Sequence, residues 1–246
     1  EFGIMPNTVP SADPDHFLGL KLAKDALLDA GYGAADDNHD GTGIILGRAT
    51  YPNRGYGTLI QHGQTIDQVI SLLKELHPDL EHDLAEKLRR GLIDSLPALG
   101  PEMMPNMVPN VISGRIANRL NLMGPNYLID AACASSLLAI EAAARELVAG
   151  ACDMMIAGGM HLIVSPQHYM LFSQLNGLSR SKLHPFGDGA DGTLLGEGIG
   201  LFVLKRLADA ERDDDRIYAV LKGAGSSSDG RAVGLLAPRG EGQLLA

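Results

Sequence analysis

Along the first half of the chain, apolar residues recur at the spacings that are typical of several helices and of one strand. Apolar residues recur at helical spacing over residues 17–30, and Gly31 follows in the position of a helix C-terminal cap. The other segments of this half can be interpreted in the same way. We expect a buried strand at 44–47, a surface loop at 48–64, two helices over 66–90 separated at Pro78, and a helix over about 108–121.

The second half is patterned more strongly, with strands and helices in alternation. The segment 135–149 is apolar almost all round, which predicts a helix buried on most sides, with Glu141 and Arg145 spaced for an ion pair. Some strands are apolar on both faces, and this indicates a layered α/β architecture. The strands expected here lie at 127–129, 154–157 ending in Gly158-Gly159, 199–204 and 217–221.

Composition narrows the function classes. The 246 residues include 20 Lys+Arg and 30 Asp+Glu, so the formal net charge of −10 argues against a nucleic-acid-binding protein. Two cysteines exclude a disulfide framework and a cysteine-rich zinc site, and they fit a reducing compartment. Thirty glycines predict tight turns and close backbone contacts. Neither a secretory signal nor a bilayer-length apolar run is visible, so we expect a soluble, cytoplasmic protein with no membrane span.

The segment 127–150 carries the strongest candidate chemistry. It predicts a strand that runs into Cys133 and a helix that begins two or three residues later. A helix N-terminus favours a thiolate, and its free N–H groups can stabilise an oxyanion. The small neighbours Ala132 and Ala134 leave room for an acyl chain, and Ser135 or Ser136 can cap the helix. A buried structural cysteine is the alternative, and the local pattern by itself leaves both interpretations open.

A longer stretch of sequence carries a resemblance to a known family. The run DAACASSLLAIEAAARELVAGACDMMIAGGMHLIVSPQHYMLFSQLNGLS resembles the active-site region of β-ketoacyl synthases, the condensing enzymes of fatty-acid and polyketide assembly. The resemblance continues in the segment VISGRIANRLNLMGPNYLID before it and in the segment HPFGDGADGTLLGEGIGLFVLKRLADAERDDDRIYAVLKGAGSSSDGRAVGLLAPRGEGQ after it. The resemblance is strong over 106–243 and looser over 1–47. It is closest to ketosynthase domains of iterative type I polyketide and polyunsaturated fatty-acid synthases.

This resemblance implies a fold, a reaction and a set of partners. The fold would be the N-terminal half of the layered thiolase-like architecture (αβαβα). Cys133 would be the nucleophile that takes an acyl chain from a carrier-protein thioester, and Ala132 and Phe172 would line the acyl pocket, although plain core packing of Phe172 is the alternative. Decarboxylative condensation with malonyl on a second carrier would follow.

The same resemblance implies that no metal or organic cofactor is bound directly, because the phosphopantetheine arm of an acyl carrier protein delivers the substrate. Members of the family are homodimers that pair through the strand before the nucleophile, here near residues 125–130. Carrier proteins are usually acidic, so the negative net charge predicts either a covalently tethered carrier or a local basic patch, for which Arg89 and Arg90 are candidates.

Two departures from the family pattern affect this interpretation. The family uses two histidines in His-Gly-Thr-Gly-Thr and Asn-Ile-Gly-His motifs, and none of the eight histidines here stands in either context. Gly187 also replaces the usual aspartate after Pro-Phe, which puts a local hydrogen bond in doubt. We therefore expect residues 1–246 to be the N-terminal portion of a ketosynthase domain, truncated at both ends and inactive alone. A non-catalytic dimerising fragment, or a thiolase-like or hydrolytic cysteine enzyme, are the alternatives.

Several weaker signals have simpler explanations. Cys152 enters a buried strand without an activating neighbour and is expected to be structural. His62 is expected in a loop, and the acidic run at 213–215 is expected to be a solvated turn rather than a metal site. The glycines at 196–200 enter a strand, so they are not a phosphate-binding loop. The methionines at 103, 104 and 107 are compatible with a pocket, a dimer surface or simple core filling.

Overall fold

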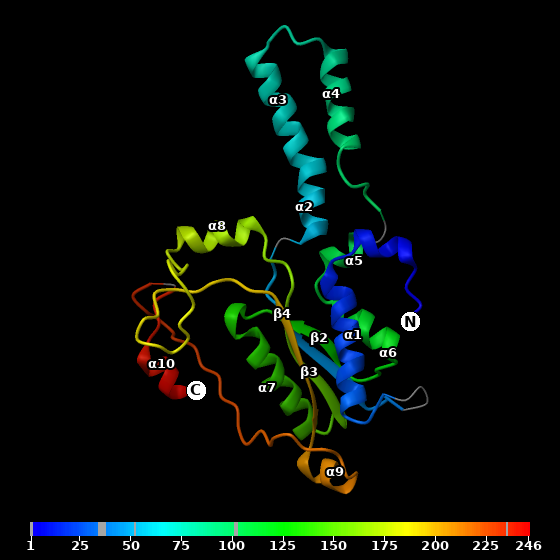
Figure 1. Ribbon diagram of the computed structural model, residues 1–246, viewed down its shortest axis with the longest axis vertical. Helices are drawn as coiled ribbons and strands as arrows, with labels where there is room; N and C mark the ends of the chain where they lie inside the picture. Colours follow the sequence, from blue (N-terminus) through cyan, green and yellow to red (C-terminus); the bar gives the residue numbers. More distant parts are fainter. Residues whose placement is uncertain (1, 34–37, 52, 101–102, 235) are drawn as a thin grey trace.

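A four-stranded sheet with helices on both faces forms the body of the protein (Figure 1). The computed structural model describes residues 2–33, 38–51, 53–100, 103–234 and 236–246. The strands are β1 (Thr42–Gly47), β2 (Asn126–Ile129), β3 (Met154–His161) and β4 (Gly198–Lys205). The helices of the body are η1 (Pro6–Ser11), α1 (Pro14–Asp29), α5 (Met103–Met107), α6 (Val111–Leu120), η3 (Ala132–Ala134), α7 (Ser135–Val148), α8 (Pro166–Gln174), α9 (Leu207–Arg212) and α10 (Gly240–Leu245).

The sheet has the strand order β2-β1-β3-β4. β1 pairs in parallel with β2 and β3, with Ile45 opposite Tyr127 on one side and Ala157 on the other. β4 runs antiparallel to β3. Helices connect the three parallel strands, as the alternating sequence pattern predicted, and the carboxyl ends of these strands therefore meet at one edge of the sheet.

Alternate residues of the central strands belong to two separate cores. Ile44 and Leu46 of β1 pack with α1 and α6 on one face of the sheet, where Leu20 and Ile116 are fully buried. Ile45 lies on the opposite face, under the alanine-rich side of α7. Because successive side chains of a strand point to opposite faces, a central strand that is covered on both sides must be apolar at every position. The continuous run 44–47 has this pattern.

A helical hairpin projects from the body (Figure 1). α2 (Arg54–Ile60) continues through a π-helical turn, η2 (Gln61–Thr65), into α3 (Ile66–Leu76), and α4 (His82–Asp94) packs against α3. The break at Pro78 is confirmed. The expected surface loop at 48–64 is wrong from residue 54 onward, because the Asn53 side chain accepts the Tyr56 N–H at 2.9 Å and starts a helix there.

Three further expectations need correction. Residues 217–221 form no strand; Tyr218 is 75% exposed, and the apolar run has no neighbouring strand with which to pair. β3 does not end at 157 but continues through Gly158-Gly159 to His161, because β4 pairs along its whole length. α7 buries one face only, since Leu137 and Val148 on the other face are 72% and 85% exposed. The Glu141–Arg145 ion pair of this helix is confirmed.

Helix α1 ends as its sequence predicts. Gly31 adopts φ +88°, and the N–H of Tyr32 bonds back to the carbonyl of Leu27 at 2.8 Å, which closes a Schellman-type cap. Within the described residues, every helix is too short or too polar to span a lipid bilayer.

Candidate active site

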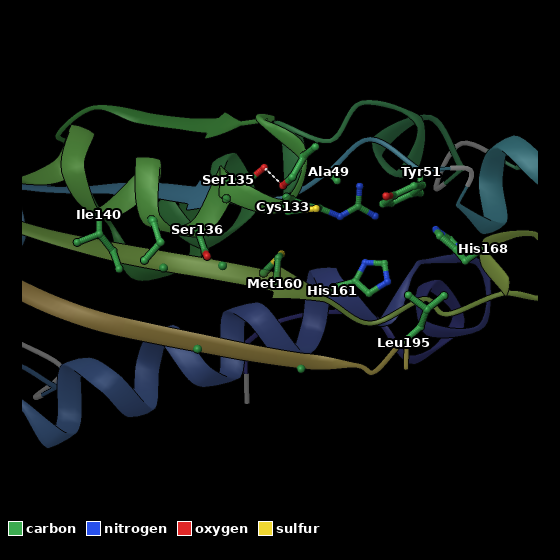
Figure 2. A pocket seen from close by; sticks show the side chains of 18 of the residues that line it. Ala49, Tyr51, Cys133, Ser135, Ser136, Ile140, Met160, His161, His168 and Leu195 are labelled. Atoms are coloured by element: carbon green, nitrogen blue, oxygen red, sulfur yellow. Dashed lines mark hydrogen bonds between the residues drawn. The ribbon is translucent and has the colours of Figure 1, made fainter. Parts of the chain in front are cut away.

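Cys133 occupies the short turn η3, between the end of β2 and the start of α7. The side chain is exposed and lines a cavity of about 530 Å³ (Figure 2). The strand, turn and helix expected around it are all present. The turn lies at the carboxyl edge of the parallel strands, where loops from neighbouring strands can contribute side chains to one site.

The turn that carries Cys133 is held in a strained conformation. Ala132 has φ +49°, a left-handed value that costs a residue with a Cβ about 1–2 kcal/mol. Asp130 accepts the N–H of Ala132 at 3.1 Å and the N–H of Thr50 at 2.7 Å. These bonds from Thr50 and Ala132 lower the pKa of the Asp130 carboxyl, which therefore stays ionised and keeps both donors bound.

Ser135 fixes the same turn from the helix side. Its Oγ accepts the N–H of Ala131 at 2.8 Å and donates to the carbonyl of Ala132 at 2.6 Å. The expectation that Ser135 or Ser136 caps α7 is wrong, because Ala134 occupies the N-cap position and no side chain caps it. Ser135 bonds backward to the turn instead and holds the backbone on which Cys133 stands.

Two glycines let the start of α7 lie directly on the sheet. A Cβ at Gly47 of β1 would stand 2.3 Å from the carbonyl carbon of Ser135, and one at Gly159 of β3 would stand 2.5 Å from the Cβ of Ser136. Both distances are far below van der Waals contact. The abundance of glycine has its clearest purpose here, since it allows the close approach that places Cys133 over the strand ends.

Figure 2 shows Cys133 between the two ends of the cavity, and the end that carries three polar rings is called the polar end. Ile140 lies toward one end, and Tyr51, His161 and His168 lie toward the other. The structure brings together all three residues expected at the site, since Ala132 and Phe172 line the same cavity as Cys133. The remaining lining residues are Gly47, Arg48, Ala49, Ser135, Ser136, Leu137, Gly158, Gly159, Met160, Leu195, Gly198, Gly200 and Phe202.

The polar end was not anticipated from the sequence. Arg48 follows β1 directly, and its Nε donates to Asp15 of α1 at 2.6 Å in a buried ion pair. The rings of Tyr51, His161 and His168 meet edge to face, with centroids 4.2 to 5.8 Å apart. An arginine directly after a buried strand was the one signal that sequence inspection could have used, because a charge there must face a partner or a cavity.

Cys152 differs from Cys133 in its exposure to solvent. It is 4% exposed within the core under α7, and burial raises the pKa of its thiol. The guanidinium of Arg206 donates to its backbone carbonyl at 2.7 Å. The expected structural role of Cys152 is consistent with this position.

The other residues discussed from the sequence lie away from the cavity. His62 belongs to η2 rather than a loop, with Nε2 3.0 Å from the carbonyl oxygen of Pro97. Asp213 and Asp215 both bond Lys205 Nζ, at 2.8 and 2.5 Å. Among the described residues, no three His, Cys, Asp or Glu side chains are grouped to hold a metal ion.

The candidate basic patch and the methionines can now be placed as well. Arg89 of α4 is ion-paired with Asp67, which offsets part of its charge. Met103 is buried, and neither it nor Met107 lines the Cys133 cavity; the side chain of Met104 falls outside the described part of the chain. Gly187 lies in a turn after Phe186, which is fully exposed.

Comparison with known proteins agrees with this geometry. The sequence matches the family described as "Beta-ketoacyl synthase, N-terminal domain" over residues 1–210. The chain belongs to the β-ketoacyl synthase family. Its fold is accordingly a mixed α/β fold that corresponds to the N-terminal half of the thiolase-like ketosynthase architecture.

The curated relatives of this chain are much longer than the chain itself. It is 34% identical over 243 residues to the polyketide synthase PksN of Bacillus subtilis, covering 98% of the chain but 4% of that protein. It is also 34% identical over 245 residues to one subunit of the polyunsaturated fatty acid synthase of a Thraustochytrium species, covering 99% of the chain and 8% of the relative.

Among solved structures, the chain resembles the ketosynthase from module 6 of the bacillaene synthase of Bacillus subtilis, with a TM-score of 0.72 and 30% identity. That match covers 99% of the chain and 36% of the solved ketosynthase. The chain thus spans a small part of its curated relatives and about a third of this structure. The type I polyketide and polyunsaturated fatty-acid synthase relatives agree with the sequence resemblance.

Proposed function

We propose that this chain carries the acyl-accepting nucleophile of a ketosynthase, and that Cys133 is that nucleophile. The observation that supports the proposal most directly is the exposed thiol of Cys133 on a strained turn at the N-terminus of α7, opening into a cavity. A helix N-terminus stabilises negative charge on sulfur and on the oxyanion of a tetrahedral intermediate. Cys152 is buried and does not line the Cys133 cavity.

The proposed reaction has two steps. The Cys133 thiolate attacks the carbonyl of a carrier-bound acyl thioester; the pantetheine sulfur leaves as a thiol once protonated, and the acyl group remains on Cys133 as a new thioester. Malonyl on a second carrier then loses CO₂, and the resulting carbanion at C2 attacks the acyl carbonyl. A carbon–carbon bond forms, and the Cys133 thiolate is released.

We assign the first step to residues of this chain. Neither histidine motif that the family uses for the second step occurs in these 246 residues, so the chain by itself is proposed to load an acyl group without condensing it. Ala132 and Phe172 are proposed to contact the acyl chain, because both line the Cys133 cavity. No metal or organic cofactor takes part in the proposed loading step.

The proposed partners are an acyl carrier protein, tethered or separate, and a second copy of the same chain. A carrier is proposed because the relatives are modules of multidomain synthases. Pairing of two copies along β2 is proposed because β2 is an edge strand of the sheet. The N–H of Leu128 in this strand already donates to the Asn110 side chain at 3.0 Å, so pairing would use the other free backbone groups of the strand.

Acyl loading tests the proposal. We expect the intact mass of the folded protein to rise by one butyryl group after incubation with butyryl-pantetheine, and Cys133→Ala to abolish this adduct. The matched control is Cys152→Ala, which should load like the unaltered protein because Cys152 is buried. Folded protein that gains no adduct, or a Cys133→Ala variant that still gains one, would contradict the assignment.

A further inference from the structure

His168 lines the Cys133 cavity, and one nitrogen of its ring has no hydrogen-bond partner among the described residues. The residue lies in the first turn of α8 and is 4% exposed. Among the described residues, its Nε2 atom is buried without a hydrogen-bond partner. Buried polar atoms in folded proteins are nearly always paired, so an unpaired one on a residue that lines a cavity suggests a partner supplied by a ligand in that cavity.

The other ring nitrogen determines what kind of occupant fits. Nδ1 accepts the backbone N–H of Ser165 at 3.2 Å and lies 2.9 Å from the Oγ of the same serine. Burial and the neighbouring His161 lower the pKa of the His168 ring, which is therefore neutral near pH 7. A neutral ring whose Nδ1 accepts carries its proton on Nε2. The hydrogen-bond pattern thus assigns a donor to the unpaired position.

Two neighbouring rings hold this donor in place. Tyr51 and His161 contact the His168 ring edge to face, with centroid distances of 4.2 and 5.4 Å, and both line the same cavity (Figure 2). These contacts, together with the bonds to Ser165, restrict the rotation of the imidazole. A donor that is fixed before a ligand arrives discriminates between ligands better than a mobile one.

His168 lines the same cavity as Phe172, the residue proposed above to contact the acyl chain. Phe172 follows it by four positions on α8, and both residues line the cavity. Side chains four apart on a helix lie on the same face. An acyl group that contacts Phe172 therefore passes along the face of α8 that also presents His168.

We propose that His168 is a specificity-determining residue whose Nε2–H donates a hydrogen bond to an oxygen of the acyl chain held on Cys133. The substrate class is acyl thioesters with a hydroxyl or keto oxygen on the chain, in preference to saturated hydrocarbon chains of the same length. A hydrocarbon chain would leave the donor buried and unpaired. This inference rests on the proposed acyl loading of Cys133.

The test compares 3-hydroxybutyryl-pantetheine with butyryl-pantetheine on the intact protein. We expect 3-hydroxybutyryl to load about ten times faster, the ratio that one net hydrogen bond supplies. His168→Asn keeps a polar atom near Nδ1 but removes Nε2, and should abolish the ratio. His168→Gln places an amide nitrogen near the position of Nε2 and should restore part of it. His77→Gln, at the exposed end of α3, is the control and should keep the full ratio.

A second measurement separates this inference from the proposed function. Non-transferable amide analogues of the two thioesters are titrated calorimetrically against the same variants. If neither thioester loads but the hydroxylated amide still binds about ten times tighter in a His168-dependent way, the proposed loading of Cys133 fails, while the hydrogen bond from His168 to an oxygen of the chain in the cavity is retained. Equal loading and equal binding of the two chain types, or a preference that survives His168→Asn, would overturn the inference.

Discussion

At the scale of single residues, the ion pair between Arg48 and Asp15 places two buried charges beside the site. The two side chains are 6% and 1% exposed, and Arg48 Nε lies 2.6 Å from Asp15 Oδ2. Two charges withdrawn from water are tolerated only as partners, because removal of either leaves the other uncompensated. The pair joins the start of α1 to the wall of the Cys133 cavity.

Asp15→Asn should therefore destabilise the protein strongly. We expect the free energy of unfolding, measured by urea denaturation, to fall by about 3 kcal/mol, because the Arg48 charge remains buried without a counter-ion. The control is Asp25→Asn, which breaks the exposed Lys21–Asp25 pair and should cost less than about 1 kcal/mol. Equal losses in the two variants would show that the buried pair has no special role.

At the scale of elements, the contact between α7 and the sheet decides where Cys133 stands. The start of the helix lies against Gly47 so closely that no side chain fits between them. The turn before the helix is bonded by Asp130 and Ser135. A displacement of the helix start is therefore a displacement of the thiol.

Gly47→Ala should test this coupling. We expect a loss of about 1–3 kcal/mol in the free energy of unfolding from overpacking, and acyl loading slowed by about a hundredfold because the thiol moves out of line. Gly91→Ala is the control; Gly91 lies exposed in α4 with open space around it, and alanine there should stabilise by about 1 kcal/mol. Normal loading by Gly47→Ala would show that the reactivity of Cys133 does not depend on the position of α7.

Sequence reasoning predicted elements better than it predicted contacts. The strand, turn and helix around Cys133 and the strand at 44–47 have strong local patterns, and the structure confirms them. The apolar run at 217–221 has the same local pattern but no strand beside it, and no local signal reports a missing neighbour. The helical turns at 54–65 were not predicted, because their capping residue, Asn53, is close in sequence to glycines that suggest a loop.

The candidate site shows the same difference between what the sequence predicts and what tertiary packing decides. Cys133, Ala132 and Phe172 were expected together because a family resemblance placed them, and they line one cavity. Arg48 and His168 were missed because their importance depends on burial, which tertiary packing decides. A histidine in a sequence gives no indication of whether one of its nitrogens will lack a partner.

At the scale of the whole molecule, one buried histidine makes stability depend on pH. His16 of α1 is 1% exposed, and burial, with added repulsion from Arg115 and Arg48, lowers its pKa from 6.5 to about 4. Between pH 6.5 and 4 the unfolded chain therefore binds more protons than the folded one, and stability falls as the pH falls.

The size of this effect follows from the shift. A change of this extent corresponds to about 3 kcal/mol of folding free energy that is present above pH 6.5 and lost by pH 4. Urea denaturation at pH 7 and pH 4 should show this loss, and His16→Gln should remove most of it. An unchanged pH dependence in the variant would mean that another group, such as His168, whose pKa burial also lowers, is responsible.

The central claim is that Cys133 accepts an acyl group, and peptide mapping after loading tests it most directly. The folded protein is incubated with butyryl-pantetheine, digested, and analysed by tandem mass spectrometry so that the acyl group is located to a residue. We predict one butyryl thioester, on the peptide that contains Cys133, and none on the peptide that contains Cys152. An acyl group on Cys152, or an unmodified Cys133 in folded protein, would contradict the claim.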